Sequence, residues 1–278
     1  MIPATFDYEV AESPEHAVEL LAATEDAKLL AGGHSLIPLM RLRFARPSLL
    51  VDIGRLADLS YVRDAGEQLA IGALTRYRTL KEDPLVQEHC PIVSHTAGLV
   101  GDPQVRHRAT IGGSLAHSDP ASDFPAVLIV LGAEVDAVGP GGSRTLPAAD
   151  LFRGVFESAL SPDELITEIR IPKLGSWTGW SYLKFTRRAQ DWATVAVAAL
   201  VRRDNGGVGE ARIALTNMGP VPVRAVAAEQ ALVAGDADFA AHMADEADPP
   251  SDTNASAEFR SHLARVIGAR AVGEAVNR

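Results

Sequence analysis

The spacing of apolar residues along the chain predicts helices mixed with short strands. Ala17, Val18, Leu20 and Leu21 recur at helical spacing behind Ser13-Pro14, which is typical of an N-cap followed by a proline in the first helical position. Short apolar runs bounded by glycine or proline predict strands. Further helices are expected at 74–80, 85–89, 92–100 and 124–131, the last with Asp123 as N-cap and Gly132 as its stop, and strands at 28–30, 49–53, 61–63, 68–71, 134–138, 144–146 and 164–171.

The last hundred residues have a pattern of their own. Residues 175–179, Gly-Ser-Trp-Thr-Gly, interrupt the periodicity and predict a linker. Strands are expected at 180–186, 193–202 and 209–215, antiparallel because a turn at 204–207 joins two of them. Helices follow at 225–233 and from 257 to about 272, with Gly273 as the stop, and the acidic stretch 245–253 between them reads as a solvated connector.

Composition narrows the class of protein. Hydrophobic residues make up 47% of the 278 positions and charged residues 22%, which is ordinary for a globular protein. The formal net charge of −10 argues against a nucleic acid partner, which selects for a basic face. No apolar run approaches the length of a membrane span, and the first residues lack the pattern of a signal peptide. The cytoplasm is the expected compartment.

Cys90 is the only cysteine in the sequence. An internal disulfide and a thiolate-held iron–sulfur cluster both need more than one. Cys90 lies between two apolar helical stretches, so a buried structural thiol is favoured over a nucleophile. If the protein transfers electrons, it does so through a cofactor that it does not hold by sulfur.

Two glycine pairs stand out as candidate anion-binding loops. Residues 29–38, Leu-Leu-Ala-Gly-Gly-His-Ser-Leu-Ile-Pro, lead from a strand into a short helix, with free amides expected at His34, Ser35 and Leu36. Residues 110–114, Thr-Ile-Gly-Gly-Ser, repeat the design. One such loop alone reads as a tight turn, whereas two could hold both phosphates of a dinucleotide. Neither the Walker phosphate loop nor the Rossmann fingerprint occurs, which argues against those two classes.

Several other residues admit more than one interpretation. His117, Asp119 and Asp123 could hold a metal ion, although their spacing suits this poorly, or receive the hydroxyls of a nucleotide. The motif Gly-x-Ser-x-Gly is missing, but a Ser–His–Asp hydrolase is not excluded by residue order. Lys184 alternates with apolar residues, which is typical of a solvent-facing strand position. Spacing alone favours core packing for Trp192 over an aromatic wall beside a planar cofactor.

These motifs, together with Tyr-Leu-Lys-Phe at 182–185 and Gln-Asp-Trp-Ala-Thr at 190–194, resemble the FAD-binding subunits of molybdenum hydroxylases. The likeness covers nearly the whole chain and is strongest toward the carbon monoxide dehydrogenase branch. It implies an α+β protein: a two-subdomain FAD-binding fold of the PCMH, or vanillyl-alcohol-oxidase-like, type, then a C-terminal domain with a three-stranded antiparallel sheet and helices. The implied units are residues 1–60, 61–175 and 176–278, which agrees with the pattern breaks near 60 and 176.

The resemblance also implies a cofactor and a set of residues that bind it. FAD is the expected cofactor, with its pyrophosphate on both glycine loops and with Asp123 and Ile166 in the same cavity. Lys184 would lie near the flavin, and Trp192 would face the isoalloxazine ring. The implied cofactor-binding set is Ala31, Gly32, Gly33, His34, Ser35, Leu36, Thr110, Ile111, Gly112, Gly113, Ser114, Asp123, Ile166, Lys184 and Trp192.

Two of these positions depart from the family's usual residues. Ser114 stands where many relatives have Asn, and Trp192 stands where many have Tyr. Both changes should leave FAD binding intact, while any role of the missing tyrosine hydroxyl in the choice of electron acceptor is put in doubt.

The family further implies two partners: a large subunit that carries molybdopterin and a small subunit that carries iron–sulfur clusters. The three chains would form a heterotrimer that can dimerise, either free in the cytoplasm or held at the inner face of the membrane, and would pass electrons to an external acceptor. Trp177, Trp180 and Phe185 are candidate interface anchors, with core packing as the alternative. A self-sufficient FAD oxidoreductase, or a flavin-binding module without partners, is the alternative function.

Overall fold

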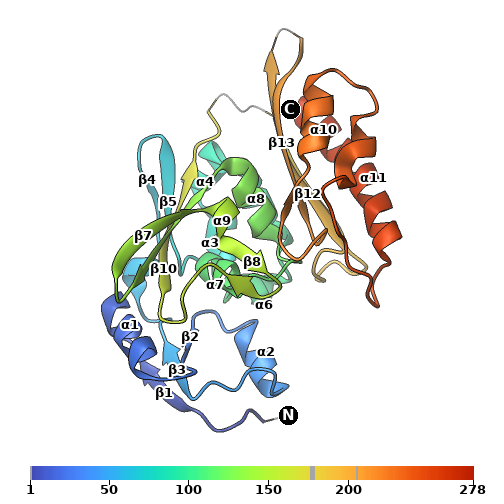
Figure 1. The fold of residues 1–278 in the computed structure, drawn as a ribbon. Coiled ribbons are helices and arrows are strands. Elements are labelled where there is room, and N and C mark those ends of the chain that lie inside the picture. Colours follow the sequence, from blue (N-terminus) through green and yellow to red (C-terminus); the bar gives the residue numbers. More distant parts are fainter. Residues whose placement is uncertain (1, 176–178, 205) are drawn as a thin grey trace.

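Three main sheets follow one another along the chain in the computed structural model (Figure 1). The structure describes residues 2–175, 179–204 and 206–278, so the central part of the predicted linker lies outside the described residues. None of the described helices is long and apolar enough to cross a membrane. The architecture is α+β, as the sequence predicted. The division at residues 60 and 175 stays a prediction.

A small parallel sheet forms the N-terminal unit, in the strand order β1-β3-β2. Ser13 caps α1 by accepting a hydrogen bond from the His16 amide at 3.1 Å. Helix α1 buries Val18 and Leu21 in the same apolar cluster as Val51 of β3. The elements of this unit are β1 (Asp7–Val10), α1 (Pro14–Ala23), β2 (Lys28–Leu30), α2 (Leu36–Arg41), β3 (Leu49–Asp52) and the 3₁₀ turn η1 (Ala57–Leu59).

The middle unit is built on a five-stranded antiparallel sheet in the order β4-β5-β10-β6-β7. Strand β10 comes last in the sequence yet lies at the centre of the sheet. The strands are β4 (Val62–Asp64), β5 (Gln68–Gly72), β6 (Glu134–Gly139), β7 (Gly142–Pro147) and β10 (Leu165–Pro172), with a separate small hairpin of β8 (Phe152–Gly154) and β9 (Glu157–Ser158). The helices are α3 (Tyr77–Glu82), α4 (Pro84–His89), α5 (Pro91–Leu99), α6 (Pro103–Arg106), α7 (Ile111–His117), α8 (Asp123–Leu131) and α9 (Ala148–Leu151).

Two helix starts in the middle unit differ from the prediction. Helix α3 begins at Tyr77 rather than at residue 74, because Thr75 bonds the backbone of Tyr61 and Arg76 forms a bridge with Thr110. Helix α8 has Ser122, not Asp123, as its N-cap. Asp123 is the first helical residue, and its carboxylate bonds side chains of the next unit. Gly132 ends α8 with a φ of +66°, as predicted.

The C-terminal sheet lies between α8 on one face and two helices on the other (Figure 1). The three predicted antiparallel strands are present, and a short fourth strand adds to them in the order β11-β12-β13-β14. The central strand β12 is buried on both faces from Val195 to Val201. The elements are β11 (Gly179–Phe185), β12 (Val195–Asp204), β13 (Gly207–Thr216), β14 (Val223–Arg224), α10 (Val226–Val233), η2 (Phe239–Ala244) and α11 (Ala257–Val276).

The stop predicted at Gly273 is wrong, because α11 continues to Val276. Tertiary packing carries the helix past this glycine: Ala275 is fully buried, and Gly179 of β11 approaches it so closely that an added Cβ would lie 2.1 Å from the Ala275 carbonyl oxygen. Near the other end of α11, Arg260 is fully buried and bonds the Thr194 carbonyl oxygen and the Asp252 carboxylate.

Candidate functional site

A cavity of about 990 Å³ is lined by residues of all three units. Its volume lies at the upper end of the usual range for small-molecule sites, which extends to roughly 1,000 Å³. Every residue of the expected cofactor-binding set lines this cavity except Ile111, whose side chain is fully buried in the core of the middle unit. The lining residues from that set are Ala31, Gly32, Gly33, His34, Ser35, Leu36, Thr110, Gly112, Gly113, Ser114, Asp123, Ile166, Lys184 and Trp192.

The first glycine loop presents unpaired backbone amides to the cavity. Gly33 has a φ of +77°, which glycine adopts at little cost, and the chain turns there from β2 toward α2. Among the described residues, the amides of Gly32, Gly33, His34 and Ser35 have no hydrogen-bond partner within the chain. A run of free N–H groups around a turn with positive φ forms a concave anion site. The loop can therefore bind phosphate oxygens through its backbone.

The second glycine loop is constructed differently from the expectation, because Ile111 to Ser114 form the first turn of helix α7, with Thr110 as its N-cap. The Ile111 amide donates to the Thr75 carbonyl oxygen at 3.1 Å, and the Gly112 amide donates to that of Ala73 at 2.8 Å. The Gly113 amide donates to the Thr110 hydroxyl at 3.3 Å, which caps α7. The Ser114 amide donates to the Thr110 carbonyl oxygen at 3.1 Å, so four of the amides expected to bind phosphate are already bonded within the protein. This loop therefore contributes mainly a small, closely packed surface to the cavity and few free hydrogen-bond donors.

The two loops pack directly against each other. A Cβ added to Gly32 would lie 2.3 Å from the Arg108 carbonyl oxygen, just before the second loop. A Cβ added to Gly113 would lie 3.7 Å from the Cβ of Ala31. The first contact explains the glycine at position 32, and both show that segments some eighty residues apart form one wall of the cavity.

Asp123, Lys184 and Tyr182 form a buried network beside this wall. The Lys184 ammonium donates to Oδ2 of Asp123 at 3.0 Å, and the Tyr182 hydroxyl donates to Oδ1 at 2.6 Å. The Lys184 and Asp123 side chains are only 6% and 7% exposed, so the prediction of a solvent-facing lysine is wrong. Burial raises the pKa of the Asp123 carboxyl above its usual value, while the neighbouring Lys184 charge acts to lower it. Burial also raises the pKa of the Tyr182 phenol.

Trp192 is an exposed side chain at the cavity, contrary to the core position that spacing favoured. It is 71% exposed and lines the cavity together with Gln190 and Asp191 of the same loop. Ile166 lines the cavity from β10, beside the irregularity in the pairing of that strand with β6. An aromatic face and an aliphatic one are therefore available to a planar ligand.

The metal hypothesis for His117, Asp119 and Asp123 is not supported: the described residues contain no group of three His, Cys, Asp or Glu side chains placed to hold an ion. His117 packs against Phe156 with ring centroids 5.0 Å apart, and burial lowers its pKa. The Asp119 carboxylate accepts the Ala121 amide at 2.9 Å. Cys90 is fully buried, and burial raises the pKa of its thiol to about 12, as expected of a structural cysteine.

Sequence reasoning missed several residues that the structure adds to the site. Tyr77, Val100, Phe156 and Glu164 also line the cavity. None belongs to a recognisable motif, and each reaches the cavity through tertiary packing. Tyr182 could have been found, because it lies two residues before Lys184 on one strand and the two side chains must share a face.

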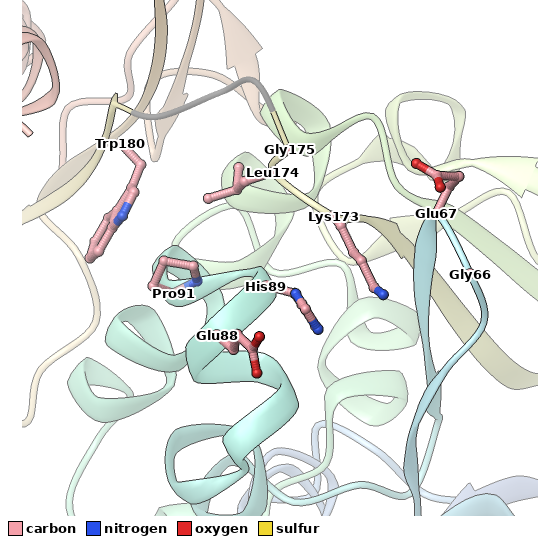
Figure 2. A pocket seen from close by; sticks show the side chains of 9 residues that line it. All are labelled: Gly66, Glu67, Glu88, His89, Pro91, Lys173, Leu174, Gly175 and Trp180. Carbon is pink, nitrogen blue, oxygen red and sulfur yellow. The ribbon is translucent and has the colours of Figure 1, made fainter.

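A second cavity, of about 510 Å³, lies at the tip of the β4–β5 hairpin, next to the junction of α4 and α5 (Figure 2). Lys173 lines this cavity, and its ammonium group is paired with the Asp64 carboxylate at 2.8 Å. Glu67, Glu88 and His89 supply its other charged and titratable groups. The cavity shares no residue with either glycine loop, so it lacks the free amides that distinguish the larger one.

Comparison with known proteins identifies the family. Residues 4–174 match the family described as the FAD binding domain in molybdopterin dehydrogenase, and residues 180–275 match the CO dehydrogenase flavoprotein C-terminal domain. The chain belongs to the FAD-binding subunits of the molybdenum hydroxylase family, as the motifs indicated.

Within this family, the chain is 40% identical to the carbon monoxide dehydrogenase medium chain of Hydrogenophaga pseudoflava, over 99% of this chain and 98% of that one. It is also 40% identical to the 6-hydroxypseudooxynicotine dehydrogenase complex subunit alpha of Paenarthrobacter nicotinovorans, over 100% and 97% of the two chains. A solved structure of the Hydrogenophaga enzyme that lacks the Mo-pyranopterin moiety superimposes with a TM-score of 0.97, at 41% identity and over 100% and 99% of the chains. The chain is thus a carbon monoxide dehydrogenase-like flavoprotein subunit of an oxidoreductase, and its cofactor is FAD.

The large cavity fits this cofactor. FAD carries a charged pyrophosphate between two flat ring systems, and the free amides of the first loop match the charge. The lining is mainly apolar in area and also includes many polar side chains, among them Asp123 and Lys184. Apolar surface suits the two flat ring systems, and polar groups can fix their orientation.

Proposed function

We propose that FAD lies in the large cavity, with its pyrophosphate on the amides of the first glycine loop. The observation that carries the proposal is the set of unpaired amides from Gly32 to Ser35 inside a cavity of suitable size. The second glycine loop forms the adjacent part of this cavity wall and would also contact the cofactor, through Thr110, Gly112, Gly113 and Ser114. Ile111 would not contact the cofactor, because its buried side chain anchors the second loop in the core.

The remaining residues of the expected set have distinct proposed roles. Ile166 and Trp192 offer surfaces for the isoalloxazine ring, and Asp123 and Lys184 supply the charged wall of the cavity. Bound FAD supplies a ring system that accepts and releases electrons one or two at a time. The protein's part is to bind and orient that ring and to limit its contact with water.

We further propose that the chain transfers electrons between other components and does not itself oxidise the substrate. A single, buried cysteine leaves no thiolate-held cluster within the chain, so electrons would come from the iron–sulfur clusters of a partner subunit. They would pass through FAD to an external acceptor. A molybdopterin-bearing large subunit would complete the heterotrimer, which can dimerise. The complex would lie in the cytoplasm, free or at the inner face of the membrane.

The substrate would be chosen by the large subunit. Two relatives of equal identity to this chain are named for different substrates, carbon monoxide and 6-hydroxypseudooxynicotine. Because the chain is equally similar to both relatives, the comparison supports a flavoprotein whose own sequence does not depend on which substrate another subunit of its complex oxidises.

The candidate interface anchors have different surroundings. Trp177 lies outside the described residues. Trp180 is half-buried, with the Arg278 guanidinium 3.7 Å from its ring centroid. Phe185 is 37% exposed and meets Phe259 edge to face. Phe185 and Phe259 therefore form an accessible aromatic pair that a partner could contact.

The test compares the isolated chain with the assembled complex. The purified chain should bind FAD and fail to oxidise carbon monoxide, aldehydes or N-heterocycles with a dye acceptor. Addition of the iron–sulfur and molybdenum chains should restore turnover and reduce the flavin. Sustained oxidation by the single chain would instead favour the self-sufficient oxidoreductase, and flavin that stays oxidised in an active complex would exclude this electron path.

A further inference from the structure

Tyr182 is the deepest member of the buried network at the cavity wall. Its side chain is 1% exposed and its hydroxyl donates to Oδ1 of Asp123 at 2.6 Å. Tyr182 does not line the cavity, whereas Asp123 and Lys184 do. Since Tyr182 and Lys184 are two residues apart on β11, both reach toward α8 from the same face of the C-terminal sheet.

Each oxygen of the Asp123 carboxylate accepts a hydrogen bond from a different one of these two neighbours. Oδ1 accepts the Tyr182 hydroxyl, and Oδ2 accepts the Lys184 ammonium. An ammonium group has three N–H donors. Lys184 directs one to Asp123 and a second to the Leu99 carbonyl oxygen at 3.3 Å, which leaves a third for the cavity. The charge therefore has a fixed position beside the ligand space.

We propose that Tyr182 is a positioning residue for FAD: by holding Asp123 through its hydroxyl, it fixes the Lys184 ammonium at the cavity wall. The inference rests on the proposed location of FAD in this cavity. Tyr182 acts through Asp123 and Lys184 and does not touch the cofactor.

Physical chemistry explains why the hydroxyl matters. Two charges removed from water are costly, and attraction between them offsets that cost only when the remaining hydrogen-bonding capacity is satisfied. Without the tyrosine hydroxyl, one oxygen of a carboxylate that is only 7% exposed would lose its donor within the described chain. Asp123 could then rotate or take up a proton, and either change would release Lys184 from its position.

The experiment measures how fast FAD leaves the full-length holoprotein after dilution, from the recovery of free-flavin fluorescence. The Tyr182→Phe variant should release FAD about three- to tenfold faster than the wild type, as expected for the net loss of one intramolecular hydrogen bond. In a Lys184→Met background, the same Tyr182→Phe change should leave the release rate unaltered. A tyrosine that only packs would produce equal factors in both backgrounds.

The chain offers a matched control. The Tyr61 hydroxyl donates to Glu168 at 2.5 Å, and the Arg63 guanidinium pairs with the same carboxylate at 2.7 Å. This second Tyr–carboxylate–cation group lies on the middle sheet and does not line the cavity. Tyr61→Phe should therefore leave FAD release unchanged, even if it lowers the thermal midpoint as much as Tyr182→Phe does.

Three outcomes would overturn the inference: unchanged release in Tyr182→Phe, equal factors in both lysine backgrounds, or the same acceleration in Tyr61→Phe. Should Tyr182→Phe fail to fold, Asp123→Asn tests the same network from its middle. It should speed release by a larger factor in the wild-type background than in the Lys184→Met one, and equal factors in the two backgrounds would overturn the inference. A failure of the site itself is distinguishable, because Gly33→Val would then retain FAD.

Discussion

Gly32 packs so closely against the Arg108 carbonyl oxygen that an added Cβ would lie only 2.3 Å from it. The contact joins the first glycine loop to the residues immediately before the second. It shows that this glycine is required by the protein's own packing, while the next residue, Gly33, is required by its backbone conformation. The two glycines of one motif thus predict two different mutant phenotypes.

Gly32→Ala should destabilise the fold. The clash is with backbone atoms of Arg108 and Ala109, which cannot move aside as a side chain would. Overpacking of this kind costs about 1–3 kcal/mol. Urea unfolding of the flavin-free variant should show this loss, and a free energy of unfolding equal to that of the wild type would contradict the close packing.

Gly33→Val should lose FAD while keeping most of the fold. A valine strongly disfavours the φ of +77°, and its Cβ would press on the flexible Ile37 side chain, so the loop would turn its amides away. The measurement is the ratio of flavin to protein after purification. Gly66→Val is the matched control, since Gly66 has a φ of +79° with nothing within 4 Å and lies outside the large cavity. Equal flavin loss in both variants would argue against the first loop as the phosphate site.

FAD should be bound without a covalent link. Cys90, the one cysteine, is fully buried with a thiol pKa near 12, so no thiolate is available to attack the flavin. The histidines at the cavity, His34 and His117, lie in settings that do not call for a flavin bond. Acid precipitation should release all the yellow colour into the supernatant. Colour retained by the washed pellet would disprove this.

Stability should fall in acid partly through Glu164, which lines the cavity. Arg144 donates to both of its carboxylate oxygens at 2.6 Å, and this contact holds the Glu164 pKa below its usual 4.5. A carboxyl whose pKa is lowered by folding stabilises the protein above its unfolded pKa and loses that contribution as the pH falls. Arg144→Gln should therefore cost about 1 kcal/mol at pH 7 and progressively less below about pH 4.5.

Thermal unfolding of wild type and Arg144→Gln from pH 7 to pH 3 checks this dependence. The exposed Arg153 provides the control, because Arg153→Gln removes the same charge without the paired geometry. A constant difference between wild type and Arg144→Gln across this range would show that the arginine acts by packing alone.

Local patterns predicted most of the elements, since caps, prolines and alternation act within a few residues. Ser13 and Gly132 are examples in which a single residue decided a boundary. Gly273 failed as a stop because packing of Ala275 against β11 outweighs the low helix propensity of glycine.

The candidate site was predictable where its chemistry lies in a contiguous motif, as in the two glycine loops. It was not predictable where partners are far apart in the sequence. Lys184 and Asp123 are separated by 61 residues, so alternation along β11 gave no sign that the lysine is buried against a carboxylate. The core position predicted for Trp192 was wrong in the opposite direction. An aromatic residue next to an apolar strand normally enters the core, whereas here the loop holds Trp192 exposed at the cavity.

The place of β10 in the middle sheet has a consequence for the order of events during synthesis. This strand separates β5 from β6, yet it is the last of the five to leave the ribosome. Until it has emerged, the sheet exists as two unconnected hairpins, and β10 itself carries Ile166 of the cavity wall. Lys184 and Trp192 emerge later still. A nascent chain can therefore offer FAD a complete site only after about two thirds of its length has been translated, and assembly of the flavoprotein is a late event in the life of the polypeptide.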